Sequence, residues 1–150
     1  MLGRLYDGQD CSAARALEVV GERWTLLIVR DALFRGITRF SDFQRSLGIA
    51  RNVLAARLDL LVDEGLMERR PSGDSAYDSY VLTKKGQELR AVIIALTHWG
   101  DRWAAPDGRP VFFRHRGCGG EVRLTPTCAA CETDIGADEI EAVPNSRRRR

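Results

Sequence analysis

RFSDFQRSLGIARNVLAARLDLLVDEGLMERR, residues 39–70, is the stretch that decides the fold. Its first part predicts a short helix, because Ser41 and Gln44 match a capping box and Gly48 suits the exit from a helix. After a short turn, its second part predicts a longer helix over residues 51–64. The apolar side chains of that helix share one face, which we expect to be buried: Val53, Leu54, Leu58, Leu61 and Val62.

A β-hairpin is predicted directly after these two helices. Residues 66–70 and 77–82 have strand character, and turn-forming residues fill the connection between them. Two more helices are predicted before the stretch and a long one after it. We expect Ser12 and Thr83 to cap the first and the last of these three helices, and Gly21 to end the first in a left-handed conformation. Their expected ranges are 12–20, 22–36 and 83–104.

The long last helix has apolar residues on more sides than a small domain covers by itself. One side carries Leu89, Ile93, Leu96, Trp99 and Trp103, and the apolar surface spreads further through Val92, Ile94 and Ala95. An uncovered apolar helix favours a second copy of the chain as its cover. We therefore expect a homodimer.

Composition places the chain among globular proteins. It has 150 residues, of which 44% are hydrophobic and 29% charged, so a fibrous or disordered chain is excluded. The longest unbroken aliphatic run, residues 91–96, is too short to span a membrane. The first ten residues lack the apolar core of a signal peptide. We therefore expect a cytoplasmic protein with no membrane partner.

A short helix, a turn, a longer helix and a hairpin, in this order, form a winged helix-turn-helix. The predicted fold class is mainly α with a small β-hairpin (α+β), followed by a small β-rich, ribbon-like tail. The net charge is only +2, but residues 35–57 hold five Arg against one Asp. Such a basic patch suits double-stranded DNA as partner; the alternative is a helical bundle with a solvated arginine face.

The predicted DNA-reading surface lies opposite the apolar face of the 51–64 helix. Arg51 is at the end of this helix that usually reaches base edges, and the small Ala55 and Ala56 permit close approach to DNA. We therefore expect DNA contacts from a set of mostly basic and small residues: Arg39, Ser41, Arg45, Arg51, Asn52, Ala55, Arg57, Arg69 and Arg70.

Four motifs, found in the family's order, resemble the HxlR-type winged-helix transcriptional regulators, relatives of the MarR group. They are CSAARALEVVGERWTLLIVRDALF from residue 11, RFSDFQRSLGIARNVLAARLDLLVDEGLMERR from residue 39, YVLTKKG from residue 80 and WGDRW from residue 99. The resemblance implies a homodimer that binds a near-palindromic operator and regulates adjacent genes. We expect a repressor that responds to a redox or small-molecule signal.

The hairpin tip departs from this family's pattern. Many relatives have a basic residue there, whereas the tip SGDSAYDS carries Asp74 and Asp78 and no Lys or Arg. Contacts to DNA phosphates are therefore expected from Arg69 and Arg70 at the hairpin base, or are weak.

Cys11 lies where the resemblance places a cysteine in many relatives, and in some of them that thiol senses oxidants or electrophiles. A helix N-terminus and Arg15 both favour its thiolate. The alternative is a small thiol buried under the dimer interface. Four aromatic residues are candidates for an effector pocket and equally for ordinary core: Trp24, Phe40, Phe43 and Trp99.

The tail carries the spacing His115-x2-Cys118-x9-Cys128-x2-Cys131. Two such pairs on hairpin turns can meet around one tetrahedral zinc, and four protein ligands leave no open position for catalysis. We therefore expect one structural zinc per chain, with a disulfide between two of the cysteines as the alternative. The predicted domains are a winged helix over 1–104, a zinc-ribbon-like extension over 105–143 and a disordered basic tail over 144–150.

Two other functions remain open from the sequence. One is a zinc-ribbon adaptor, and the other is a thiol redox protein that uses Cys128 and Cys131. A thioredoxin-like site needs a helix after the cysteine pair, and no helical pattern follows it here. No Ser-His-Asp or paired-carboxylate arrangement stands out, so we expect no enzyme activity.

Overall fold

The computed structural model describes residues 11–71 and 77–144. The chain divides into two compact units, Met1–His98 and Trp99–Arg150, so the division falls a few residues before the boundary expected at 104. Two sequence predictions lie outside the described residues: the hairpin tip around Asp74, and residues 145–150 of the basic tail. Among the described helices, none is long and apolar enough to cross a membrane.

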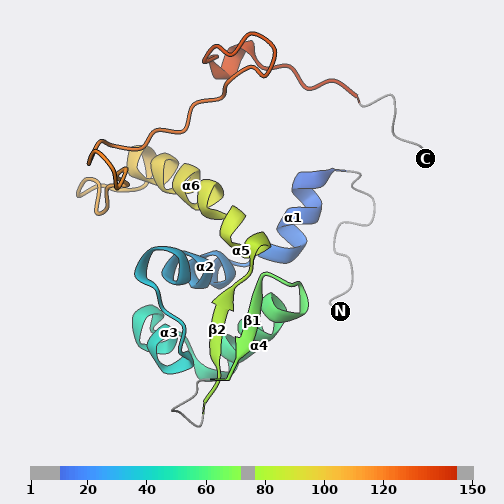
Figure 1. The fold of residues 1–150 in the computed structure, drawn as a ribbon, viewed down its shortest axis with the longest axis vertical. Coiled ribbons are helices and arrows are strands. Elements are labelled where there is room, and N and C mark those ends of the chain that lie inside the picture. Colours follow the sequence, from blue (N-terminus) through green and yellow to red (C-terminus); the bar gives the residue numbers. More distant parts are fainter. Residues whose placement is uncertain (1–10, 72–76, 145–150) are drawn as a thin grey trace. The chain divides into compact units, whose positions relative to one another are not determined.

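The first unit is mainly helical with one small antiparallel hairpin, as predicted (Figure 1). Apolar spacing accounts for the first four helices, because each lays apolar residues on a shared core. The elements are α1 Ser12–Val20, α2 Arg23–Arg35, α3 Phe40–Leu47, α4 Arg51–Asp63, β1 Met67–Arg70, β2 Ser79–Leu82, α5 Lys84–Glu88, α6 Arg90–Trp103 and, in the second unit, the 3₁₀ turn η1 Ala137–Glu139. The rest of the described tail forms loops with two isolated β-bridges.

The core lies between α2, α3, α4 and the start of β1. Leu54, Leu58 and Leu61 of α4 are fully buried, as predicted, while Val53 and Val62 are only half-buried at its margin. The other buried apolar residues of this cluster are Val20, Ile28, Val29, Phe43, Ile49, Leu66 and Met67. Phe43 is thereby assigned to the core rather than to an effector pocket.

The hairpin pairs with the segment before α3 as well as within itself. Met67 lies opposite Leu82 and Arg70 opposite Ser79 in the β1–β2 ladder. On the other edge of β2, Arg39 bridges to Ser79, and the Tyr80 amide donates to the Thr38 carbonyl at 2.7 Å. This pairing fixes the hairpin beside the entrance to α3.

That pairing explains why the predicted capping box at Ser41 is wrong. Arg39 ends the extended segment, and its carbonyl already accepts from the amides of Asp42 and Phe43, both at 3.1 Å. The helix therefore begins at Phe40, with Arg39 as N-cap and without a side-chain cap. Ser41 lies inside the first turn, two positions after the N-cap.

Two predictions about α1 are also wrong. Cys11, not Ser12, is its N-cap, and it makes no side-chain cap hydrogen bond. Gly21 has φ −73°, a right-handed conformation, because the chain turns directly into α2. By contrast, Gly36 and Gly48 leave α2 and α3 in the left-handed conformation, with φ of 66° and 61°.

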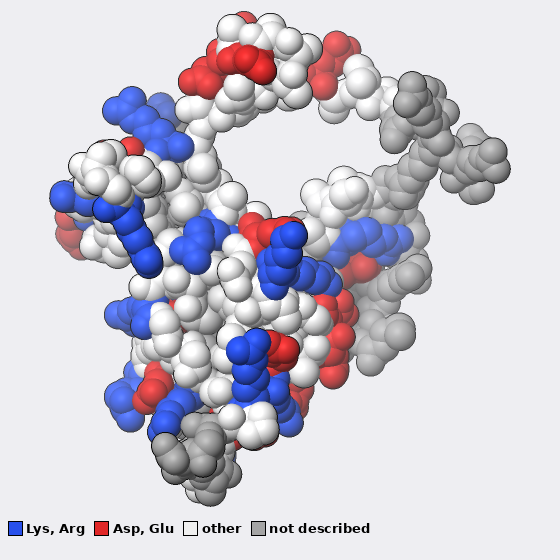
Figure 2. Space-filling view, in the orientation of Figure 1, with Lys and Arg blue, Asp and Glu red and all other residues white. Residues whose placement is uncertain are grey.

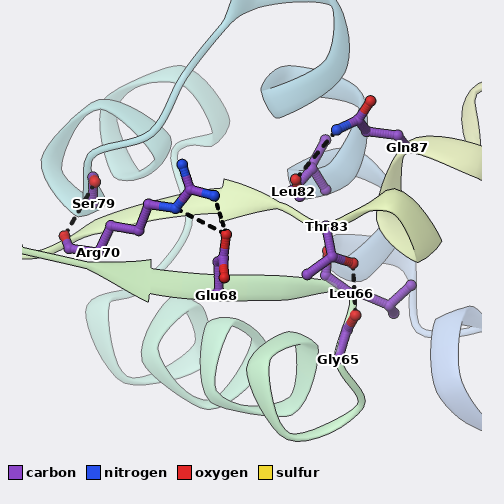
Figure 3. A network of polar contacts seen from close by, with 8 residues as sticks. All are labelled: Gly65, Leu66, Glu68, Arg70, Ser79, Leu82, Thr83 and Gln87. Carbon is purple, nitrogen blue, oxygen red and sulfur yellow. Dashed lines mark hydrogen bonds and ion pairs between the residues drawn. The ribbon is translucent and has the colours of Figure 1, made fainter.

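The long helix predicted over 83–104 is in fact two helices that meet at Leu89. The Thr83 cap is confirmed, because its hydroxyl accepts from the Gly86 amide at 3.2 Å and also reaches the Gly65 carbonyl at 2.7 Å (Figure 3). A Cβ on Gly86 would overlap the Leu66 carbonyl oxygen, so this glycine lets α5 lie directly on the start of the hairpin. The chain then bends, and α6 leaves this anchored turn in a new direction.

A buried carboxylate joins α2 to α3. Asp31 is fully buried on α2, and the Ser46 hydroxyl on α3 donates to its Oδ2 at 2.5 Å. Arg30 donates to Oδ1 at 2.9 Å, and Arg35 donates to the Ser46 hydroxyl at 2.5 Å. Both carboxylate oxygens therefore have partners, and one of those partners belongs to the neighbouring helix.

We predict that Ser46→Ala destabilises the winged-helix unit by about 1–3 kcal/mol, because a buried carboxylate oxygen loses its donor from α3. Urea unfolding followed by circular dichroism measures this change. Ser41→Ala is the matched control in the same helix. It should change the unfolding free energy by less than about 0.5 kcal/mol, since this exposed hydroxyl does not cap α3. Equal effects of the two changes would contradict the role given to Ser46.

Candidate nucleic-acid interface

The N-terminal end of α4 presents an exposed polar surface. Arg51, Asn52 and Ala56 are exposed, and Ala55 is half-buried. The Arg51 guanidinium lies over the Phe40 ring, 5.3 Å from its centroid, which holds the charge at the junction of α3 and α4. Small side chains beside an arginine that is held in place let this end of the helix fit into a groove of duplex DNA.

Three predicted residues lie on or beside α3. Arg39 and Ser41 are exposed at its start. Arg45 is 78% exposed, and it pairs with Asp42 at 3.1 Å, one turn back on the same helix. In Figure 2, basic side chains at the end of the molecule that carries α3 and the hairpin are interspersed with acidic ones rather than forming one continuous patch.

Arg57 differs from the other residues predicted to touch DNA. Its side chain is only 25% exposed, and its Nε lies 3.3 Å from a carboxylate oxygen of Glu22. The same Glu22 carboxylate accepts from the Trp24 amide at 2.9 Å and so caps α2. Arg57 therefore joins α4 to the start of α2, a pairing that helix periodicity does not reveal.

Both arginines at the hairpin base are paired with carboxylates. Arg69 forms an ion pair with Asp59 of α4 and lies over the Tyr80 ring, 5.5 Å from its centroid. Arg70 donates through Nε to Glu68 at 2.8 Å, as Figure 3 shows. The Arg69 pair ties the hairpin to α4, so these two elements present one continuous surface.

A shallow cavity of about 200 Å³ opens beside the hairpin, where the sequence predicted nothing. Its lining is mainly apolar, with Thr38, Gln87 and Arg90 among its polar members: Ala32, Leu33, Ile37, Thr38, Tyr80, Val81, Leu82, Gln87 and Arg90. Trp24 and Phe40 pack against the core instead, and Trp99 is 61% exposed on α6. For Trp24, Phe40 and Phe43 the structure thus agrees with the alternative of ordinary core.

Cys11 is exposed at the start of α1. The Arg15 guanidinium, expected to favour its thiolate, forms an ion pair with Glu18 at 3.1 Å. Cys11 is the N-cap of α1, and the positive end of a helix dipole favours negative charge.

An exposed apolar stripe runs along α6. Val92, Leu96, Trp99 and Trp103 are 47%, 52%, 61% and 66% exposed. Their spacing of four, three and four residues places them on one side of the helix. Ile93 and Ile94, outside this stripe on the same helix, are buried.

The tail holds its candidate ligands as two separate pairs. His115 Nδ1 lies 3.3 Å from Cys118 Sγ, while Cys128 and Cys131 belong to a second turn, in which the Glu132 amide donates to the Cys128 carbonyl at 2.8 Å. Over residues 11–71 and 77–144, no three His, Cys, Asp or Glu side chains lie close enough to share a metal ion. Hydrogen bonds from the hydroxyl and backbone of Thr133, and then from Cys128, lower the pKa of the Cys131 thiol to about 7.

Residues 19–108 match the family described as HxlR-like helix-turn-helix. The chain belongs to this family. It is 42% identical to the uncharacterized HTH-type transcriptional regulator Rv3095 of Mycobacterium tuberculosis over 95% of this chain and 90% of that protein. HxlR-like proteins are transcriptional regulators and not enzymes, which confirms the prediction of no enzyme activity and disfavours a thiol oxidoreductase.

Solved structures of related proteins agree with this fold. The crystal structure of PA1607, described as a candidate transcription factor, has a TM-score of 0.82 at 39% identity, covering 91% of this chain and 96% of that one. The transcriptional regulator YodB of Bacillus subtilis, solved with quinone bound, has a TM-score of 0.53 at 29% identity. That match covers 63% of this chain and all of YodB.

Proposed function

We propose that this chain is a homodimeric repressor that binds a near-palindromic operator through α4 and the hairpin. The observation that carries the proposal is the exposed N-terminal end of α4, where Arg51 and Asn52 precede the small Ala55 and Ala56. An arginine or asparagine side chain at this end of a recognition helix can form paired hydrogen bonds with a base edge. Membership in the HxlR-like family supports DNA as the ligand.

The roles of the predicted residues follow from their surroundings. Arg51 and Asn52 read bases, while Ala55 permits the helix to approach. Arg39, Ser41 and Arg45 at α3 contact phosphates, as do Arg69 and Arg70 once DNA competes with their carboxylate partners. Arg57 acts on DNA only through the position of α4, because its side chain is only 25% exposed and pairs with Glu22.

We predict that Arg51→Ala weakens operator binding by about 1–3 kcal/mol and weakens binding to random DNA much less. Fluorescence anisotropy measures both affinities, with an operator selected from a random DNA library by the wild-type protein. Arg123→Ala, a change at an exposed arginine of the tail, is the control for net charge and should leave the difference between the two affinities intact. Equal losses on both DNAs would mean that Arg51 touches only the backbone.

The α6 stripe supports the homodimer. Four exposed apolar residues with coiled-coil spacing form a seam that a second copy of the same helix can cover. A near-palindromic operator requires such a two-fold arrangement of recognition helices. Leu17 on α1 is 53% exposed and adds apolar surface elsewhere on the first unit.

Leu96→Glu should raise the dissociation constant of the dimer at least about 100-fold, or about 2.7 kcal/mol, because it places a charge in the seam. Analytical ultracentrifugation over a concentration series measures this constant. Ala91→Glu places the same charge on an exposed position of α6 outside the stripe and should leave the dimer intact. A wild-type protein that is monomeric at micromolar concentration would exclude the homodimer.

The bound quinone in YodB supports a response to a redox or small-molecule signal in this chain as well. Cys11 is the proposed point of attack, because it is exposed and begins α1. We expect benzoquinone to lower the operator affinity of the wild-type protein at least about tenfold and to leave Cys11→Ser unaffected, since a helix N-terminus favours the reactive thiolate. Ser12→Ala, at the neighbouring exposed position, is the control and should keep the full quinone response. Equal loss of affinity in Cys11→Ser would move the sensor to another thiol.

A further inference from the structure

The first cysteine turn of the tail has a distinctive hydrogen-bond pattern. The His115 amide donates to the Gly120 carbonyl at 2.8 Å, and the Gly119 amide donates back to the His115 carbonyl at 2.8 Å. An isolated β-bridge between Arg114 and Glu121 closes the turn. Gly119, directly after Cys118, is in the left-handed conformation with φ 73°.

The second turn repeats this pattern thirteen positions later. The Cys128 amide donates to the Thr133 carbonyl at 3.0 Å, and the Glu132 amide donates back to the Cys128 carbonyl at 2.8 Å. A bridge between Thr127 and Asp134 closes it. The agreement extends to the next pair of residues outward in each turn. In the first turn the Val122 amide donates to the Phe113 carbonyl at 2.8 Å, and in the second the Ile135 amide donates to the Pro126 carbonyl at 2.9 Å.

The backbone of Glu132 shows how closely the second turn copies the first. Glu132 takes the place of Gly119 and has φ 58°, the one left-handed non-glycine residue in the described part of the chain. A side chain in this conformation is disfavoured, so the surrounding turn imposes it. The two turns therefore share one backbone shape, although one has glycine and the other glutamate at this point.

This shared shape places candidate metal ligands at equivalent positions. His115 corresponds to Cys128, and Cys118 corresponds to Cys131. The 3.3 Å between His115 Nδ1 and Cys118 Sγ is close to the separation of two ligand atoms on one tetrahedral zinc, which bond lengths of about 2.3 Å to sulfur and 2.1 Å to nitrogen set at about 3.6 Å. Each turn thus holds one half of a tetrahedral site.

We propose that one Zn²⁺ joins the two turns of a single chain through His115, Cys118, Cys128 and Cys131. Binding replaces the three thiol protons, which pass to solvent, and histidine binds as neutral imidazole. The resulting centre carries one net negative charge. Arg114 and Arg116 flank His115 and offset that charge.

The two ligand pairs lie apart in the structure, but few contacts hold the two turns in that arrangement. Their separation is therefore consistent with the proposal. In the two turns only Phe113, Val122, Cys128 and Ile135 are half-buried, and the other side chains are exposed. Residues 123–125, between the turns, belong to neither hydrogen-bond pattern. Closing the turns onto a metal therefore disrupts no apolar core, and the metal supplies the contact that the apolar residues do not.

Metal analysis of the full-length protein, purified under reducing conditions, tests the proposal. We expect about one zinc per chain in the wild type and less than about 0.1 in both Cys118→Ser and Cys128→Ser, since four ligands share one ion. Cys11→Ser is the matched control and should keep the full zinc content. Cobalt exchanged into the wild type should give the absorption of tetrahedral thiolate coordination, and exchange into Cys128→Ser should not.

A mixing experiment tests whether the four zinc ligands come from one chain or from two. If the pairs of different chains shared the ion, a refolded mixture of Cys118→Ser and Cys128→Ser would regain zinc, because each chain keeps one intact pair. We expect no recovery. Recovery of zinc in the mixture, wild-type protein without zinc, iron in its place, or full zinc content in either tail variant would each overturn the proposal.

Discussion

The carboxylate of Asp31 is the constraint on which the winged helix depends. An ionised group without access to water costs several kcal/mol unless charged and hydrogen-bonding partners surround it. Here Arg30 comes from the same helix, while the Ser46 hydroxyl comes from α3, so the carboxylate is satisfied only when α3 lies in one place. The turn after α3 then places the buried Ile49 and, two residues later, Arg51. A buried charge on α2 thus helps to determine where α4 begins.

Apolar spacing predicted the helices because the core selects one face of each. The range 12–20 and the start at Arg51 agree with the structure, and the fully buried side of α4 follows from its leucines. Helix ends were harder to predict because they depend on contacts from other segments. Pairing of Arg39 with β2 moved the start of α3, and contact of Gly86 with Leu66 separated α5 from α6. Neither contact is local in sequence.

The candidate interface shows the same contrast between features that local spacing predicts and features that depend on contacts between distant segments. Exposure of the N-terminal end of α4 could be predicted, because it lies opposite the leucine face. The partners of the charged residues could be predicted only when they lie one turn apart, as for Arg45 and Asp42. The pairing of Arg57 with Glu22 joins residues far apart in the chain, and it required the packing of α4 on α2. The sequence predicted two ligand pairs on hairpin turns, but it did not show that the turns share one backbone shape, because Glu132 stands in the second where Gly119 stands in the first.

These ion pairs change what the basic residues contribute to DNA binding. Arg45, Arg69 and Arg70 each have a carboxylate partner before DNA arrives. A phosphate must compete with that partner, so each contact exchanges one ion pair for another and contributes less than an unpaired arginine would. The electrostatic attraction of the protein to DNA of any sequence is weakened as well, because the acidic partners repel the phosphate backbone of the DNA. Under the proposed function, discrimination between DNA sequences then depends more on shape and base contacts at the start of α4 than on total charge, which agrees with a chain whose net charge is only +2.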